Sequence, residues 1–287
     1  MSSLIGRPFL KMNGLGNEIL VLDLREGGVV TPAEARALAA RDATRFDQLM
    51  ALHPGRGDVD AFMRIYNADG SEAAACGNGT RCVAWALMRE SGRDGALLET
   101  SAGPLVCSAG AEPDQVTVDM GAPKFDWADI PLSEPFADTR AIELQVGPID
   151  APLIHSPSVA NVGNPHAIFW VSDLDVVDLG RVGPLLENHP LFPERANISL
   201  ARIDSRAALT LKVWERGAGL TLACGTSACA SAVSAARTRR TGRDVTVTLP
   251  GGSLRIQWRE GDDHILMTGP ATFEHDGRID AALLAEA

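Results

Sequence analysis

The sequence predicts an α+β protein made of two copies of one unit, each with a mainly antiparallel sheet around one long helix. Three observations predict this fold. Matching sequence blocks recur at a spacing of about 148 residues, strand-like segments follow one another without alternating helices, and a glycine-containing step opens one long helix in each half. Strands that cluster around a helix are typical of the α+β class and argue against a doubly wound sheet.

The internal repeat consists of four blocks in the same order. Such an order at nearly constant spacing indicates a tandem duplication with pseudo-twofold symmetry. The matched blocks are Gly16-Asn17 with Gly163-Asn164, 64–67 with 212–215, Ala75-Cys76-Gly77 with Ala223-Cys224-Gly225, and 101–105 with 250–254.

The first part of each copy is predicted to hold two strands. Aliphatic residues over 19–24 and 167–171 predict the first strand, and segments 61–67 and 208–215 predict the second, each ending in a turn. Between them in the first copy, Thr31-Pro32-Ala33-Glu34 has an N-cap residue, a proline at the first helical position and an acidic first turn. We therefore expect a helix to start there.

The second part of each copy is predicted to be a long helix followed by hairpin strands. The helices are expected over 81–89 and 228–237, the first with an apolar face that includes Cys82, Val83 and Leu87, the second alanine-rich and packed on every side. The strands that follow are expected over 97–100, 105–108 and 115–120 in the first copy, and over 244–249, 253–258 and 265–267 in the second.

The boundary between the copies is predicted from composition. A linker is expected between Pro123 and Gly147, where prolines alternate with acidic residues. The two domains are therefore predicted over residues 1–124 and 125–270.

Composition excludes several classes of partner. The chain of 287 residues has 26 Lys+Arg and 37 Asp+Glu, a net charge of −11, which repels a phosphate backbone, so no nucleic-acid partner is expected. The apolar runs are far shorter than the ~20 residues of a membrane-spanning helix. Arg7 interrupts the N-terminus before any apolar stretch of signal-peptide length, and the five cysteines suggest no disulfide framework. A reduced, cytoplasmic protein is expected.

Cys76 and Cys224 are the candidate catalytic groups. Each stands where a long helix begins, and the free N–H groups and positive dipole end of a helix N-terminus favour an anion. We therefore expect each thiol pKa to fall below the ~8.5 of a free cysteine. Taken alone, either cysteine would be weak evidence, because a single cysteine is most often a small buried residue; that is the interpretation of Cys82, Cys107 and Cys229.

The duplication indicates that the two thiols could act together on one substrate. Two pseudo-symmetric helix N-termini that face each other would place one sulfur on each side of a bound carbon. One thiolate could remove an acidic proton while the opposite thiol delivers another, which inverts the stereocentre. Each sulfur would need to reach within about 3–3.5 Å of that carbon, so the two should be roughly 6–7 Å apart in a closed form.

Cofactor-dependent chemistries fit the sequence less well. The cysteine spacings match no common zinc finger, and no metal site is expected. A cysteine hydrolase would gain nothing from a second symmetric thiol. A pyridoxal-phosphate enzyme would need one of only three lysines, Lys11, Lys124 and Lys212, for its Schiff base. No cofactor is predicted.

The chain resembles the diaminopimelate epimerase family over nearly its whole length. The similarity lies in motifs from both halves: Lys11-Met12-Asn13-Gly14-Leu15-Gly16-Asn17, Asn67-Ala68-Asp69-Gly70-Ser71-Glu72, Cys76-Gly77-Asn78-Gly79, Gly163-Asn164-Pro165-His166, Phe192-Pro193-Glu194-Arg195-Ala196-Asn197, Glu215-Arg216-Gly217, Ala223-Cys224-Gly225-Thr226 and Leu249-Pro250-Gly251-Gly252-Ser253-Leu254.

The resemblance implies a fold and an activity. The fold would be two pseudo-symmetric halves, each a β-barrel-like sheet around a central helix, with the site in the cleft between them and the tail over 271–287 returning to the first domain. The activity would be pyridoxal-phosphate-independent interconversion of LL- and meso-2,6-diaminopimelate in the bacterial lysine and peptidoglycan route. A homodimer is the family expectation.

The resemblance also implies residue roles. Cys76 and Cys224 would be the acid/base thiols, with His166 the partner of Cys76 and Glu215 the partner of Cys224. The helix N-terminal amides of Gly77-Asn78 and Gly225-Thr226 would bind the reacting carboxylate. The remainder of the substrate, with its second carboxylate and second ammonium group, would be held by Asn17, Gln48, Asn67, Asn164, Asn197 and Arg216, with contacts from Glu215.

Several of these residues also have ordinary structural interpretations. Asn17 and Asn197 could be turn residues, His166 a buried structural histidine, and Glu215-Arg216 an exposed ion pair. Departures from the family pattern occur at Asn13, where histidine is usual, at Glu18, where aspartate is usual, and in Thr44-Arg45-Phe46 before Gln48. None of them touches the two thiols.

Three alternative functions stay open from the sequence, and one of them is a catalytically silent protein that binds the substrate and leaves its configuration unchanged. The same scaffold could racemise another amino acid without pyridoxal phosphate. A protein of a different class would use Cys76 and Cys224 as a redox dithiol. Turnover of single-carboxylate amino acids separates the racemase alternative, and deuterium uptake at the substrate α-carbon without a redox partner separates the redox alternative.

Overall fold

A computed structural model describes residues 2–73 and 76–285 of the chain. The chain forms two compact units, which we call unit 1 (1–119 and 268–287) and unit 2 (120–267). Ala75, which belongs to a repeat block, and the last two residues of the predicted tail lie outside the described residues.

Unit 1 is a sheet of mainly antiparallel strands. Neighbouring strands pair in the order β19-β1-β2-β3-β4-β6-β7-β8, with the short β5 also on β4; the pairs β2–β3 and β4–β6 are parallel. The strands are β1 (Pro8–Gly14), β2 (Asn17–Asp23), β3 (Gln48–Pro54), β4 (Ala61–Asn67), β5 (Glu72–Ala73), β6 (Gly95–Thr100), β7 (Gly103–Ala109), β8 (Gln115–Asp119) and β19 (Thr272–Arg278).

Unit 2 repeats this plan. Its strands pair in the order β11-β12-β13-β14-β16-β17, with β15 on β14, and β12–β13 and β14–β16 are again parallel. They are β11 (Ser158–Asn161), β12 (Pro165–Trp170), β13 (Asn197–Ser205), β14 (Ala208–Glu215), β15 (Gly219–Thr221), β16 (Asp244–Leu249) and β17 (Gly252–Trp258); β18 (Ile265–Pro270) follows, and β9 (Gln145–Val146) pairs with β10 (Ile154–His155) in a small separate sheet.

The matching strand order confirms the predicted α+β fold of two repeated units. Strands, helices and both parallel pairings recur at the same places in each unit. Among the described strands, each unit is an open sheet that curls around a helix and not a closed barrel.

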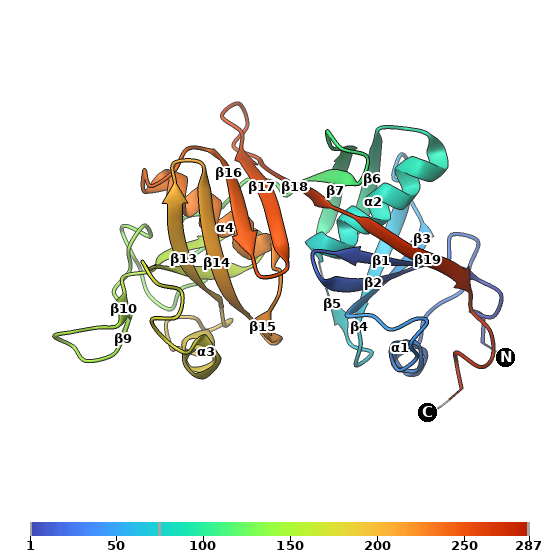
Figure 1. Cartoon of the computed structure of the whole chain (residues 1–287), viewed down its shortest axis with the longest axis horizontal. Helices are drawn as coiled ribbons and strands as arrows, with labels where there is room; N and C mark the ends of the chain where they lie inside the picture. Colours follow the sequence, from blue (N-terminus) through green and yellow to red (C-terminus); the bar gives the residue numbers. More distant parts are fainter. Residues whose placement is uncertain (1, 74–75, 286–287) are drawn as a thin grey trace. The chain divides into compact units, whose positions relative to one another are not determined.

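One long helix lies at the centre of each sheet. Helix α2 (Gly77–Ser91) contacts β1, β2, β3, β6, β7 and β8, and α4 (Gly225–Arg237) contacts β11 to β14, β16 and β17 (Figure 1). Helix α4 is buried on nearly every side, with the run from Ser227 to Ala235 inaccessible to solvent, as its alanine-rich sequence predicts. These two helices fix where Cys76 and Cys224 lie.

Two shorter helices pack against the sheets, α1 (Pro32–Ala39) on β4 and α3 (Leu179–Glu187) on β13, β14 and β15. Helix α1 begins at Thr31, whose side chain accepts the N–H of Glu34 in a complete capping box, which confirms the predicted start. Helix α3, which contains Pro184, was not predicted. Strands β1, β3, β13 and β19 were also not predicted.

The C-terminal segment belongs to unit 1. Strand β19 pairs antiparallel with β1, and Arg278 donates a hydrogen bond to the Gly6 carbonyl. The first and last described segments of the chain therefore both belong to unit 1 (Figure 1). The fully buried Arg81 donates to the Pro270 carbonyl at 3.2 Å, so the returning segment also satisfies a buried charge.

The prediction of a linker between Pro123 and Gly147 is wrong. Segment 123–147 is irregular in backbone but belongs to unit 2, where Ile130, Leu132, Ile142 and Leu144 are buried in the hydrophobic core. Prolines and acidic residues gave it the composition of a boundary, whereas widely spaced aliphatic side chains anchor it.

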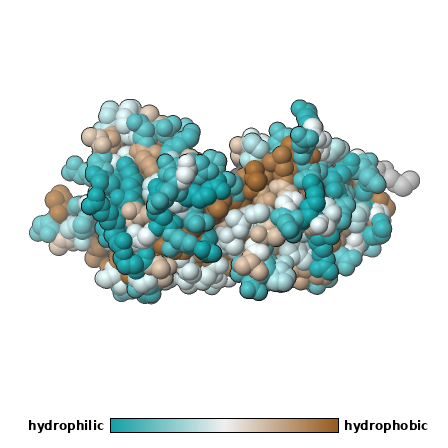
Figure 2. Space-filling view, turned by 90° about the horizontal axis from the view of Figure 1, so that it is seen from above, coloured by the Kyte–Doolittle hydropathy of each residue, from teal (hydrophilic) through white to brown (hydrophobic). Residues whose placement is uncertain are grey.

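The visible surface of both units is mostly hydrophilic, with a band of hydrophobic residues on unit 1 (Figure 2). Exposed large apolar side chains of unit 1 include Val106 and Phe273, and the Phe273 ring stacks on Trp85 with centroids 6.2 Å apart. Over the residues described, none of the helices is both long and apolar enough to cross a membrane.

Candidate active site

Polar side chains gather at one end of each sheet, beside the start of its central helix. In unit 1, β2 begins at Asn17 and β3 begins at Gln48, and Gln48 is directly opposite Asn67, where β4 ends. Strands β2 and β3 are parallel and both start at this end of the sheet, and the antiparallel β4 ends there. The side chains of Asn17, Gln48 and Asn67 therefore lie at the same end of the sheet. In unit 2 the same edge carries His166 and Asn197, which are paired across β12 and β13.

Cys76 is the N-cap residue of α2. Its sulfur accepts the Gly79 N–H at 3.3 Å, so the thiol satisfies a backbone donor that has no intrahelical partner. The thiol donates toward the Gln48 side-chain oxygen at 3.7 Å. Cys76 is half-buried.

Gln48 is held firmly despite the unusual residues that precede it. Thr44 donates to the Leu38 carbonyl, and Phe46 is buried in the unit 1 core. The Asp47 carboxylate accepts the Glu18 N–H at 2.8 Å, which ties β3 to β2. The departure from the family pattern therefore leaves Gln48 within reach of Cys76.

The other unit 1 candidates differ in how their side chains are used. The Asn67 side chain donates a hydrogen bond to the Ser71 hydroxyl, within the turn that connects β4 to β5. The side-chain oxygen of Asn17 is buried and has no hydrogen-bond partner among the residues described, which is unusual for a buried acceptor. The side-chain oxygen of Asn78 accepts a hydrogen bond from Arg81 at 3.0 Å. A Cβ added to Gly14 would lie only 3.1 Å from the Asn78 Cβ, so the two residues are in close contact.

Cys224 is the N-cap residue of α4, but its surroundings differ. The residue is only 4% exposed, and its sulfur lies 3.4 Å from the Thr226 hydroxyl. Burial and the negative charge of Glu215 raise the pKa of the Cys224 thiol above that of an ordinary cysteine. The predicted fall in the Cys224 pKa is therefore wrong, because desolvation of the thiolate outweighs the helix N-terminus.

Glu215 ends β14 and faces Cys224. Its carboxylate accepts the Thr221 hydroxyl at 2.6 Å. Burial raises the Glu215 pKa, while hydrogen bonds from Thr221 and the Cys224 thiol oppose that shift. The carboxyl group is therefore poised to share a proton with the sulfur.

His166 is completely buried at the start of β12. Its Nε2 lies 2.6 Å from the Asn164 side-chain oxygen, and its Nδ1 lies 3.2 Å from the Ser227 hydroxyl. Because that oxygen can only accept, Nε2 carries the ring proton and Nδ1 accepts from Ser227. Burial, with the nearby positive charge of Arg216, lowers the His166 pKa to about 3, so the ring is neutral at physiological pH.

Asn197 and Arg216 are joined through the backbone. The buried Asn197 amide donates to the Pro165 carbonyl and accepts the Arg216 N–H, each at 3.0 Å. The Arg216 guanidinium donates to the Glu194 carbonyl at 2.9 Å. In unit 2 the structure thus brings together all predicted residues, with Asn197 acting on the loop that carries Glu215 and Arg216.

Sequence reasoning missed two buried polar groups near this loop. The Glu187 carboxylate accepts from the Trp214 indole at 2.7 Å and from the Gly217 N–H at 3.0 Å, on either side of Glu215-Arg216. Ser227 is 0% exposed and contacts His166. Its position three residues after the N-cap Cys224 was a usable signal, since such side chains lie beside the cap.

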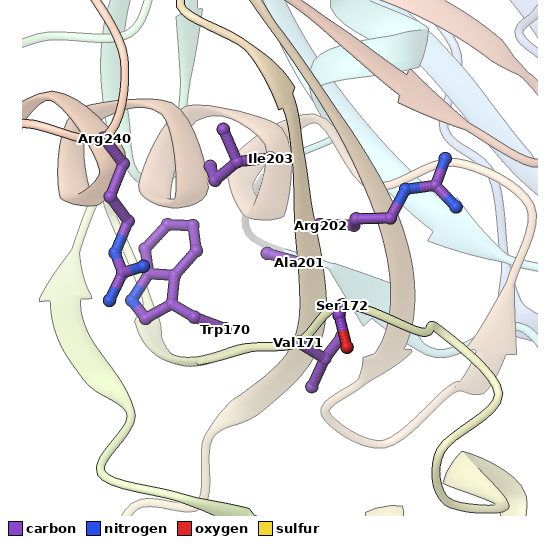
Figure 3. A pocket seen from close by; sticks show the side chains of 7 residues that line it. All are labelled: Trp170, Val171, Ser172, Ala201, Arg202, Ile203 and Arg240. Atoms are coloured by element: carbon purple, nitrogen blue, oxygen red, sulfur yellow. The ribbon is translucent and has the colours of Figure 1, made fainter.

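The remaining cysteines and surface hollows lie apart from these residues. Cys82, Cys107 and Cys229 are buried, as predicted, and burial raises the pKa of both Cys82 and Cys107 to about 12. A hollow of about 460 Å³ in unit 2 is lined by Arg202 and by Arg240 over the Trp170 ring, and contains none of the predicted site residues (Figure 3). In the described residues, no cluster of three His, Cys, Asp or Glu side chains could hold a metal ion.

Comparison with a family model decides the relationship. The diaminopimelate epimerase model matches residues 9–125 and again residues 158–274, once in each unit. The chain belongs to the diaminopimelate epimerase family. The double match also confirms the duplication from an independent direction.

Relatives and solved structures agree with this family. Diaminopimelate epimerases from a Bradyrhizobium species and from Rhodopseudomonas palustris are 62% and 61% identical, over 99% and 100% of this chain and 99% and 98% of theirs. A hydroxyproline epimerase from Agrobacterium vitis, with bound trans-4-OH-L-proline, has a TM-score of 0.66 at 17% identity over 98% of this chain and 94% of that one. A predicted epimerase from Pseudomonas aeruginosa has a TM-score of 0.65, also at 17% identity, over 95% and 99% of the two chains. At these identities the structural matches show the fold alone.

Proposed function

We propose that the protein is a cofactor-independent isomerase that interconverts LL- and meso-2,6-diaminopimelate, with Cys76 and Cys224 as the two acid/base groups. The observation that carries the proposal is that each unit presents a cysteine as the N-cap of its central helix, among polar side chains at the same edge of its sheet. Family membership at 62% identity supplies the substrate. The reaction would serve lysine and peptidoglycan synthesis.

The proton transfers balance without an external reagent. The Cys76 thiolate would take the α-proton and become a thiol, and the Cys224 thiol would give its proton to the opposite face of the carbanion and become a thiolate. The raised Cys224 pKa supports its role as the protonated partner before this step. Reversal of both transfers runs the other direction, and the pair would titrate as one unit.

The surrounding residues would bind and orient the substrate. Helix N-terminal amides at Gly77-Asn78 and Gly225-Thr226 would stabilise the reacting carboxylate as negative charge develops. The unpartnered oxygen of Asn17 supports its role toward an ammonium group. Gln48, Asn67, Asn164, Asn197 and Arg216 would complete the contacts, with Glu215 beside Cys224 and His166 assigned to Cys76.

The test follows deuterium and configuration together. LL-diaminopimelate in D₂O should become the meso form and gain deuterium at one α-carbon, with no cofactor or redox partner added. Cys76→Ser and Cys224→Ser should each lower this rate by at least about 10³-fold, because a hydroxyl is a far weaker base at neutral pH. Cys82→Ala and Cys229→Ala, buried cysteines on the same two helices, are the matched controls and should keep most activity.

The other outcomes identify the alternatives. Preference for single-carboxylate amino acids would show a racemase of another substrate on this scaffold. No deuterium uptake would refute the epimerase and favour a redox dithiol. A near-normal rate in either serine variant would remove that cysteine from the mechanism.

Assembly and location are also proposals. We propose a homodimer, as the family resemblance implies, and light scattering at working concentration tests it. We propose a cytoplasmic location because acid/base chemistry needs both sulfurs reduced, which a reducing compartment maintains. A small-molecule substrate is the proposed ligand.

A further inference from the structure

Ser227 occupies a position that the proposed chemistry does not yet use. Its side chain is 0% exposed, and its hydroxyl lies 3.2 Å from His166 Nδ1, although 61 residues separate the two in sequence. It is also the third residue of α4, and a side chain there lies beside that of the N-cap, Cys224. Ser227 therefore lies between the imidazole and the thiol.

The hydroxyl has one proton and two possible acceptors. While Cys224 is a thiol, the Ser227 hydroxyl donates its hydrogen bond to the neutral Nδ1 of His166. The other ring nitrogen, Nε2, already donates to Asn164. Once Cys224 has given up its proton, the sulfur becomes the stronger acceptor, and hydrogen bonds to a charged group are roughly twice as strong as neutral ones.

We propose that Ser227 is a positioning residue for the reaction: its hydroxyl turns from His166 Nδ1 to the Cys224 sulfur when that sulfur becomes a thiolate, and so stabilises the charged state. No bond forms or breaks at Ser227, because the hydroxyl only redirects its hydrogen bond. The proposal rests on the proposed role of Cys224. The charged group that acts on this sulfur is Glu215 on β14, which opposes the thiolate, while Arg216 acts on His166.

The equivalent position in unit 1 has no side chain. The third residue of α2 is Gly79, and a Cβ there would lie 2.5 Å from the Sδ of the fully buried Met50. From this residue it is the backbone N–H that reaches the Cys76 sulfur, at 3.3 Å. The third residue of the central helix therefore carries a hydroxyl group in unit 2 but not in unit 1.

The experiment measures Cys224 directly, apart from turnover. The rate of Cys224 alkylation by iodoacetamide, followed by peptide mass spectrometry between pH 7 and 10, reports its thiolate fraction. Ser227→Ala should slow this alkylation about ten-fold at a given pH and lower kcat about ten-fold with little change in KM. Ser227→Thr, which keeps the hydroxyl, should restore both.

The matched control is Ser231→Ala, one turn further along α4, where the buried hydroxyl has no hydrogen-bond partner among the described residues. It should leave alkylation and kcat unchanged. A merely structural Ser227 would make the opposite prediction, since looser packing exposes Cys224 and speeds its alkylation. Faster or unchanged alkylation in Ser227→Ala overturns the proposal. Full activity of Cys224→Ser would instead refute the proposed function itself.

Discussion

The two cysteine environments share a backbone plan and differ in their chemistry. Cys76 is half-buried and contacts a neutral amide and a backbone N–H. Cys224 is buried, lies beside the Glu215 carboxylate and has hydroxyl neighbours. Duplication thus supplied equivalent positions, and later substitution gave the two cysteines different surroundings.

This difference suits a reaction that needs one thiol and one thiolate at the start. A buried sulfur next to a carboxylate holds its proton, because its anion would be poorly solvated and repelled. The Cys76 sulfur accepts an N–H at the start of a helix, a contact that favours the thiolate. We therefore expect Cys76 to be the resting base and Cys224 the resting acid.

Among changes to the surroundings of the two sulfurs, the largest effect is expected from Glu215→Gln, which removes the negative charge beside Cys224. Epimerisation should fall about 100-fold, within the range for loss of a general acid/base group. Cys224 alkylation should become faster at a given pH, because removal of the negative charge lowers the thiol pKa. Glu72→Gln, at an exposed ion pair in unit 1, is the control. Slower alkylation would contradict the assigned role of Glu215.

The reciprocal change, Gln48→Glu, gives Cys76 a carboxylate neighbour. The new charge would stand near the sulfur, since the Gln48 oxygen lies 3.7 Å from it. Cys76 alkylation at pH 7.5 and kcat should each fall about ten-fold as the thiol holds its proton more tightly. Gln48→Leu removes the amide without adding charge, so equal effects of the two variants would show that charge is not the cause.

A smaller effect is expected on acid stability through His166. Its pKa is about 3 in the folded protein and near 6.5 when unfolded, so between these values the unfolded chain binds one more proton. The free energy of unfolding should therefore decrease as the pH is lowered through this window, by up to about 1.4 kcal/mol per pH unit. The stabilising contribution is complete above pH 6.5 and is lost as pH falls toward 3.

Urea unfolding at pH 7, 6 and 5 measures this slope. His166→Gln should lose less stability than the wild type across the series, whereas His155→Gln, at an exposed position, should behave as the wild type. Identical slopes in wild type and His166→Gln would show that His166 titrates normally in the folded protein.

The elements that sequence predicted are those with strong local patterns. The strands ending at Asn67 and Glu215 and the helices after Cys76 and Cys224 have regular apolar spacing, and the repeat reinforced each from the other half. Strand β19 was missed because it is polar and mostly exposed, so it has no apolar alternation to recognise. Helix α3 was missed because Pro184 interrupts its pattern.

For the candidate site, too, features with a sequence pattern could be predicted and features that depend on packing could not. The repeat predicted a cysteine at the start of each central helix, which the structure shows, and the family motifs supplied most of the polar residues proposed around them. Burial of Cys224 was not readable, because it depends on how α4 packs within its sheet. The contact between Ser227 and His166 joins residues far apart in sequence, and no local pattern encodes such a meeting.

The pairing of β19 with β1 has a consequence for the order in which the protein is made. Unit 2 is in effect an insertion between β8 and the last strand of unit 1, so the ribosome finishes unit 2 before unit 1 has its final edge. Until those closing residues emerge, the Arg81 guanidinium lacks the Pro270 carbonyl that it binds. A chain that stops a few dozen residues early would therefore contain both cysteines and yet hold an unfinished N-terminal half.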